Sequence, residues 1–326
     1  MNKSNITNIS VIVIFFVISI VISEILIRLL IGPPSYFFYT ASFTDKQNNW
    51  NINYEIIDIL RTNCDNKKVD NKIAVIGDSF VFGQGVDNCD DFVSKLNEKS
   101  DKYSFYNFGL IGVGANEYSM VVRDFLDDSY NAAIIVFYGN DISDLKNYKD
   151  RSLLGIVADK SSILSLIRKY KRSRSVEVKV SNMGNENNFD NNVISVIKNN
   201  PSYFYDTDYP GLDEKLLFEK QFNALSSELA KKNINNIYIA VVPGGENLSR
   251  ELHEFIINNG GKTAEFGINS ESYRFIKDLS DQNNYIFIDT FNEFSKNGDK
   301  YYFENDLHWN EHGHKLMSEI IIQNIK

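Results

Sequence analysis

Apolar positions along the chain follow two kinds of pattern from about residue 72 to the C-terminus. Short apolar runs predict buried strands, and they cover residues 73–76, 103–108, 132–138, 237–242 and 285–288. Apolar residues three and four positions apart predict helices between and after these runs. The helical stripes are Phe92 to Leu96, Tyr118 to Leu126, Phe218 to Leu229 and Leu316 to Ile321. Strands that alternate with helices indicate a parallel sheet covered on both faces, so we expect a three-layer α/β/α domain.

A different pattern precedes this domain. Residues 9–31 are almost wholly apolar, with Glu24 and Arg28 as the only charges, and a helix of this length reaches roughly 34 Å, enough to cross a bilayer core. A cleaved signal peptide and a buried soluble helix are the alternatives. The length of the run and the lack of a small-x-small cleavage site favour a retained single-pass anchor. Lys3 favours a cytoplasmic N-terminus at residues 1–8, which places the rest of the chain on the extracytoplasmic side of the cell membrane.

The pattern also divides the remaining chain. Residues 32–70 are interpreted as a connector with one short helical stretch near residues 54–60, and residues 71–326 as one domain. Residues 147–211 show little periodicity and are interpreted as an insertion. Within them, the basic cluster at residues 168–174 is typical of a solvated helix face. Contact with anionic lipid head groups or an acidic glycan is the alternative.

Composition narrows the classes of partner. The chain has 326 residues, of which 43 are acidic and 34 are basic, and its net charge is −9. This balance argues against nucleic acid as a partner, because phosphate binding needs a basic face. Cys64 and Cys89 are the only cysteines and no Cys/His cluster occurs, so we expect no metal site and no cofactor. If the domain is exported, the two thiols could form a disulfide, a pairing that the sequence leaves open.

Ser79 is the candidate nucleophile. It follows the apolar run 73–76 in the sequence Gly77-Asp78-Ser79-Phe80, just before a helical stripe. The carboxyl end of a parallel strand is where α/β sheets place their ligands and chemistry, and N–H groups at a helix start face an anion formed there. The alternative is a serine that only caps the following helix.

A serine hydroxyl needs an adjacent base, and His308 is the candidate. It lies in Asn305-Asp-Leu-His-Trp-Asn310, after the last predicted strand and before the final helix. His312 and His314 are interpreted as helix-start or surface residues. Asp306 is the candidate for orienting the imidazole, in a Ser-His-Asp arrangement that is recognised by geometry rather than chain order. Asp289, at the end of the last strand, is a weaker substitute.

Acyl transfer also needs hydrogen-bond donors aimed at the developing oxyanion. Asn140 follows the third predicted strand in Gly139-Asn140-Asp141 and offers a side-chain amide. Gly112, in Asn107-Phe-Gly-Leu-Ile-Gly112, offers a backbone N–H that no side chain crowds. The backbone N–H of Ser79 is the third expected donor.

These pieces, in this order, resemble the SGNH (GDSL-like) hydrolase family from about Lys72 to the end of the chain. The resemblance implies a flavodoxin-like fold and the following roles: Ser79 as nucleophile, Gly112 and Asn140 in the oxyanion hole, and His308 as base. Many members carry an Asp three residues before the His, where this chain has Asn305. The Asp306-x-His308-Trp309 form is similar to that of membrane-linked polysaccharide O-acetyltransferases of the superfamily.

We therefore expect a membrane-anchored serine esterase that hydrolyses or transfers O-acyl groups, such as O-acetyl, on carbohydrate esters. Its partners would be an acylated carbohydrate or another small ester, and the membrane. The alternative from a different class is a non-catalytic glycan-binding or assembly protein that retains the fold. A serine peptidase is a weaker option, because nothing in the sequence marks a peptide-binding cleft.

Overall fold

The computed structural model describes residues 3–30, 41–46, 50–57, 59–61, 69–142, 161–164, 166–167, 197–198, 210–263, 265–303 and 306–325. The chain divides into two compact units, described separately below. The first comprises Met1–Phe38 and Lys149–Asn182, and the second comprises Tyr39–Tyr148 and Met183–Lys326.

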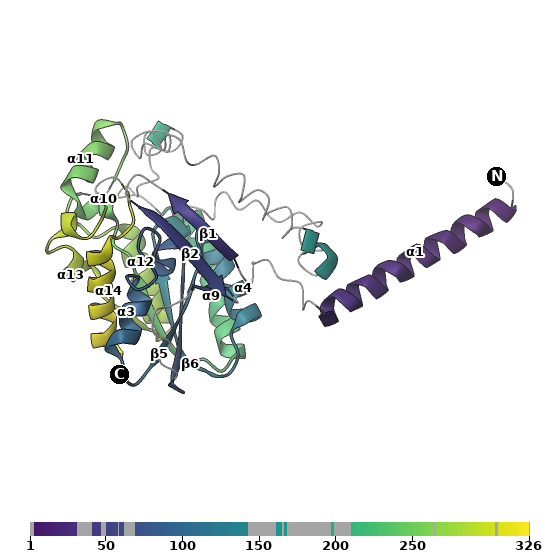
Figure 1. Ribbon diagram of the computed structural model, residues 1–326. Coiled ribbons are helices and arrows are strands. Elements are labelled where there is room, and N and C mark those ends of the chain that lie inside the picture. Colours follow the sequence, from purple (N-terminus) through teal and green to yellow (C-terminus); the bar gives the residue numbers. More distant parts are fainter. Residues whose placement is uncertain are drawn as a thin grey trace. The chain divides into compact units, whose positions relative to one another are not determined.

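The apolar N-terminal helix is present as α1, Lys3–Leu30 (Figure 1). Its stretch Val11–Leu30 has a mean hydropathy of 2.7 and is not buried inside the protein, so its length and composition suffice to cross a membrane. Glu24 and Arg28, four residues apart, form an ion pair at 2.8 Å. Glu24 also accepts a hydrogen bond from the backbone N–H of Ser162.

The second unit contains a five-stranded parallel sheet, which confirms the predicted fold class. Its strands are β4 (Lys72–Gly77), β5 (Ser104–Gly109), β6 (Tyr130–Phe137), β7 (Asn236–Val241) and β8 (Ile286–Ile288). They are arranged in the order β5-β4-β6-β7-β8. In this flavodoxin-like order the winding reverses between β4 and β6, and the carboxyl ends of those two strands form the crevice where such folds bind ligands.

Helices cover both faces of the sheet (Figure 1). Helices α3 (Phe92–Lys99) and α14 (Glu311–Asn324) pack together on one face, and α4 (Ala115–Phe125) and α9 (Leu212–Lys231) pack together on the other. Phe137 of β6 contacts Phe218 of α9 with ring centroids 5.2 Å apart. Phe218 in turn contacts Phe275 of α12 (Glu271–Gln282). The sheet is thus covered on both sides, which explains why β4, β6 and β7 appear in the sequence as nearly continuous apolar runs.

Further short helices of the described residues lie in the segments that follow β4, β7 and β8. They are α2 (Ser79–Phe82), α10 (Gly245–Leu248), α11 (Arg250–Asn258), α13 (Phe291–Phe294) and the 3-10 turn η1 (Gly298–Lys300).

The connector prediction was wrong in its secondary structure. Instead of a helical stretch near residues 54–60, β1 (Ala41–Lys46) pairs antiparallel with β2 (Asn51–Ile57), and β2 pairs with β3 (Leu60–Arg61). Ile52 and Tyr54 are buried while their neighbours in β2 face outward, a period of two that is typical of a half-buried strand. Most of the predicted insertion, residues 147–211, including the basic cluster at 168–174, lies outside the described residues.

Cys89 is disulfide-bonded. Cys64, the other cysteine of the sequence, lies outside the described residues.

Candidate active site

Ser79 is the first residue of α2, immediately beyond the carboxyl end of β4. Asp78, not Ser79, caps this helix, because Asp78 Oδ1 accepts a hydrogen bond of 2.9 Å from the N–H of Phe80. Gly77 permits the close approach of the turn to the sheet, since a Cβ there would lie 2.4 Å from Val81 Cγ2 and 2.7 Å from Val136 O. The serine hydroxyl is therefore presented at the sheet edge without serving as a helix cap.

Arg61 fixes the turn that follows α2. Its guanidinium is buried and donates hydrogen bonds to the backbone carbonyls of Phe82, Gly83 and Val86, the last two at 2.7 and 2.6 Å. Gly83 adopts a φ of +80°, a conformation in which a side chain is strained. Arg61 thus satisfies three backbone carbonyls at the end of the short helix that begins with Ser79 and in the turn after it. Sequence reasoning missed this residue, because β3 lies in the segment interpreted as a connector.

His308 meets Ser79 from the other end of the chain. Its Nε2 lies 2.7 Å from Ser79 Oγ, and its Nδ1 lies 2.5 Å from Asp306 Oδ1. The same carboxylate oxygen accepts a hydrogen bond of 2.8 Å from the backbone N–H of His308, which fixes the carboxylate relative to the ring. Trp309 pairs with Tyr302 in a short antiparallel bridge that holds the loop ahead of α14. The structure therefore brings the three predicted side chains together in one hydrogen-bonded row.

The charges around the row raise the pKa of His308. Burial alone lowers the pKa of His308, but the carboxylate of Asp306, with smaller contributions from Asp78 and Asp45, outweighs it and raises the pKa of the imidazole above its ordinary value. The side chains of His308 and Asp306 remain 20% and 25% exposed, so the row is open to solvent. An imidazole with a raised pKa is a stronger base for the serine proton.

Asp289 does not take part in this row. Its Oδ1 accepts hydrogen bonds from Tyr273 Oη at 2.9 Å and from the N–H of Phe291 at 3.1 Å, and its Oδ2 accepts one from Asn292. Asp306 is thus the carboxylate that contacts His308, whereas Asp289 contacts Tyr273 and the residues at the start of α13.

The other two predicted oxyanion donors, besides the N–H of Ser79, follow the strands that flank β4. Gly112 follows β5, has a φ of +70° and is exposed, with no atom within 4 Å of a Cβ built on it. Asn140 follows β6 in a turn held by Asp141, whose Oδ2 accepts from the N–H of Tyr138 at 2.9 Å and whose Oδ1 accepts from Tyr118 Oη at 2.8 Å. Both residues therefore lie at the same edge of the sheet as Ser79, where a donor to an oxyanion belongs.

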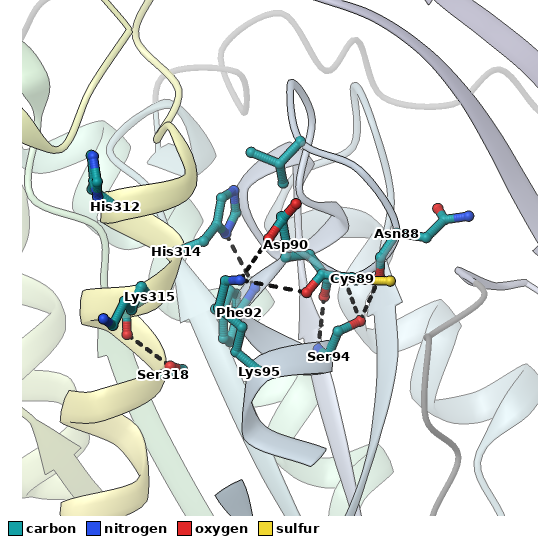
Figure 2. Close-up of polar contacts among 12 residues, drawn as sticks. Asn88, Cys89, Asp90, Phe92, Ser94, Lys95, His312, His314, Lys315 and Ser318 are labelled. Atoms are coloured by element: carbon teal, nitrogen blue, oxygen red, sulfur yellow. Dashed lines mark hydrogen bonds and ion pairs between the residues drawn. The ribbon is translucent and has the colours of Figure 1, made fainter. Parts of the chain in front are cut away.

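His314 differs from its interpretation as a helix-start or surface residue, because it is buried. It projects from α14 toward the start of α3, where its Nδ1 accepts a hydrogen bond of 3.3 Å from the N–H of Phe92 (Figure 2). Burial holds the pKa of His314 well below its ordinary range. It is thus a neutral packing residue, whereas His312 on the same helix is exposed. Among the described residues, no group of three or more His, Cys, Asp or Glu could hold a metal ion.

Comparison with known proteins gives similarity of fold. No protein-family model matches the chain, and no curated protein matches it. A solved structure of a lipolytic protein of the G-D-S-L family from Veillonella parvula is 13% identical, with a TM-score of 0.42 over 77% of this chain and 96% of that one. A lipase from a goat rumen metagenome is 15% identical, with a TM-score of 0.45 over 78% and 97%. Phospholipase A1 from Streptomyces albidoflavus is 11% identical, with a TM-score of 0.43 over 78% and 99%.

Proposed function

We propose that this protein is a serine esterase that hydrolyses or transfers O-acyl groups through an acyl-enzyme on Ser79. The observation that carries the proposal is the hydrogen-bonded row Ser79 Oγ, His308 Nε2, His308 Nδ1, Asp306 Oδ1, with spacings of 2.7 and 2.5 Å at its two contacts. A hydroxyl, a base within reach of it and a carboxylate that orients the base are the three parts of nucleophilic acyl transfer.

The first half-reaction forms the acyl-enzyme. His308 Nε2 takes the proton of Ser79 Oγ as this oxygen attacks the ester carbonyl, and the carbonyl oxygen becomes an oxyanion. Asp306 stabilises the imidazolium that results. The N–H of Ser79, the N–H of Gly112 and the side-chain amide of Asn140 are the donors that we assign to the oxyanion. As the intermediate collapses, the ester C–O bond breaks, His308 protonates the departing alcohol, and the acyl group remains on Ser79.

The second half-reaction decides between the two activities. His308 takes a proton from water or from an acceptor hydroxyl, whose oxygen attacks the acyl carbon and displaces Ser79 Oγ. The serine recovers its proton from His308. Water gives a free acid and thus hydrolysis, and a sugar hydroxyl gives a new ester and thus transfer. The same residues serve both outcomes.

The proposed substrate is an O-acylated, for example O-acetylated, carbohydrate, on account of the Asp306-x-His308-Trp309 sequence. The proposed location is the extracytoplasmic face of the cell membrane, with residues 9–31 as a single-pass anchor. Two observations support this location: α1 is long and apolar enough to cross a membrane, and Cys89 is disulfide-bonded, as is usual in oxidising compartments.

A product assay tests the proposal. The detergent-solubilised full chain is incubated with p-nitrophenyl acetate, with and without a sugar acceptor, and p-nitrophenol, acetate and acetyl-sugar are quantified. Ser79→Ala should abolish turnover, whereas the control Ser295→Ala, at an exposed serine of the same domain, should retain it. Full turnover by Ser79→Ala would show that the nucleophile is assigned wrongly.

A further inference from the structure

The β1–β2 hairpin contacts both loops that carry the reacting side chains. On the serine side, Tyr54 Oη accepts a hydrogen bond of 2.8 Å from the N–H of Gly85, and Asp45 Oδ2 accepts one of 3.0 Å from Gln84 Nε2. On the histidine side, the ring of Trp50 packs on Phe303 with centroids 5.0 Å apart. One element of the N-terminal connector thus joins two loops that are far apart in the sequence.

Trp50 lies at the meeting point of these contacts. Its side chain is 7% exposed, and its indole N–H donates a hydrogen bond of 3.1 Å to Asp45 Oδ2. Asp45 Oδ2 therefore receives hydrogen bonds from Trp50 in the hairpin and from Gln84 in the serine loop. A tryptophan held by its indole N–H and packed on a neighbouring ring has little rotational freedom.

The indole ring of Trp50 also contacts the imidazole of His308. The Trp50 and His308 rings meet edge to face at 89° with centroids 6.5 Å apart, and Phe80 packs against His308 at 5.0 Å and 35°. Phe80 and Trp50 contact the ring, while Ser79 and Asp306 bind its two nitrogens. The imidazole is thus limited in tilt and translation as well as in rotation about its χ angles.

We infer that Trp50 is a positioning residue that holds the His308 imidazole in line with Ser79 Oγ throughout the two half-reactions, with Asp45 fixing the indole. This inference rests on the proposed function and deepens it. Once Nε2 has taken the serine proton it becomes a hydrogen-bond donor, and the ring must stay in place so that this proton passes to the leaving alcohol rather than back to Ser79. Misplacement of a reacting group by about 1 Å can cost on the order of 100-fold in rate.

The alternative is that Trp50 serves only the packing of the hairpin. It belongs to a small core with Ile52, Tyr54 and Phe82. Ile52 provides a matched control, because it lies two residues further on, in β2, is 8% exposed and belongs to the same core, but is an aliphatic residue without the Phe303 and His308 ring contacts. Trp50→Ala, Trp50→Phe and Ile52→Ala are therefore compared in the detergent-solubilised full chain, with thermal unfolding measured for each.

The first readout is the separation of kcat from KM for p-nitrophenyl acetate. We expect Trp50→Ala to lower kcat by about 10- to 100-fold with KM within about twofold of wild type, because the ester is still bound but the proton transfer is misaligned. Trp50→Phe should recover part of the loss. Ile52→Ala should keep kcat within about threefold of wild type, although its unfolding temperature is expected to be similar to that of Trp50→Ala. Equal kcat values for Trp50→Ala and Ile52→Ala would overturn the inference.

The second readout does not depend on turnover. Acylation of histidines by diethyl pyrocarbonate is followed by peptide mass spectrometry, with the exposed His312 as an internal reference. Trp50→Ala should increase the modification rate of His308 relative to His312, and Ile52→Ala should not. Equal His308 rates in the two variants would overturn the inference. Failure of the proposed function is distinguishable, because the wild type itself would then show no turnover and no acylation at Ser79.

Discussion

Ser79 Oγ and His308 Nε2 lie 2.7 Å apart, although 229 positions separate the two residues in the sequence. The fold creates this contact in two steps. Parallel strands bring their carboxyl ends to one edge, where α2 begins with Ser79. The loop before α14 returns to the same edge, and the bridge between Tyr302 and Trp309 holds it there. The contact thus joins the turn after β4 to the loop before the last helix.

The carboxylate of Asp306 should set the pH dependence of the reaction. Because Asp306 raises the pKa of His308, Asp306→Asn should lower that pKa and shift the acidic limb of the kcat/KM profile to lower pH. Loss of imidazolium stabilisation should also lower kcat by about 10²- to 10⁴-fold. The measurement is a pH–rate profile with p-nitrophenyl acetate. Asp289→Asn is the control, because Asp289 contacts Tyr273 instead, and an acidic limb that did not move in Asp306→Asn would contradict the assignment.

Glu246 should make the fold less stable as the pH rises. Burial raises the pKa of this carboxyl from 4.5 to about 7, and its Oε2 accepts a long hydrogen bond of 3.5 Å from Tyr138 Oη. The unfolded state therefore releases this proton at a lower pH than the folded state does. The associated stability is present below about pH 4.5 and is lost as the pH rises through about 7.

The Glu246→Gln variant isolates this contribution. Compared with wild type, it should be more stable at pH 8 by up to roughly 3 kcal/mol, with a smaller difference at pH 5. Denaturant unfolding at the two pH values measures the effect. The control Glu254→Gln, at an exposed carboxyl of α11, should follow the wild type. The same pH dependence in Glu246→Gln and wild type would rule out Glu246 as the titrating group.

Arg61 should be worth more to stability than an exposed arginine. Replacement by methionine leaves the carbonyls of Phe82, Gly83 and Val86 without its donors and Asp91 without its buried counter-charge. We expect Arg61→Met to cost about 3–5 kcal/mol of unfolding free energy. Arg274→Met, which breaks an exposed ion pair with Glu271, should cost about 1 kcal/mol or less. Denaturant unfolding of both variants provides the comparison, and equal losses would contradict the structural role given to Arg61.

The sheet, the turn that carries Ser79 and the loop that carries His308 could be predicted from the sequence, because their signals are local. Strand β4 is a continuous apolar run that ends at glycine, and this pattern alone placed Ser79 at a strand end. The motif around His308 likewise placed that residue before the last helix. In each case the prediction needed only the neighbouring residues.

The parts that the sequence did not reveal depend on long-range contacts. The segment 51–57 has apolar residues at 52, 54 and 56, a spacing of two that is typical of a strand, but Ile52 and Ile56 also fit one face of a short helix, and the pairing with β1 decides for the strand. The choice between Asp306 and Asp289 required coordinates. Asp289 follows the last strand and Asp306 precedes the last helix, so both were expected at the same edge of the sheet. Trp50 carries no local signal for a role beside His308, since its neighbours Phe303 and His308 lie more than 250 positions away.

Covalent labelling of the serine tests the central claim most directly. The detergent-solubilised full chain is treated with a fluorophosphonate, which reacts with serines activated by an adjacent base, and the labelled peptide is identified by mass spectrometry. We predict a single phosphonyl adduct on Ser79, with labelling abolished in Ser79→Ala and strongly slowed in His308→Ala. An unlabelled wild type, or an adduct that persists on another residue in Ser79→Ala, would contradict the account.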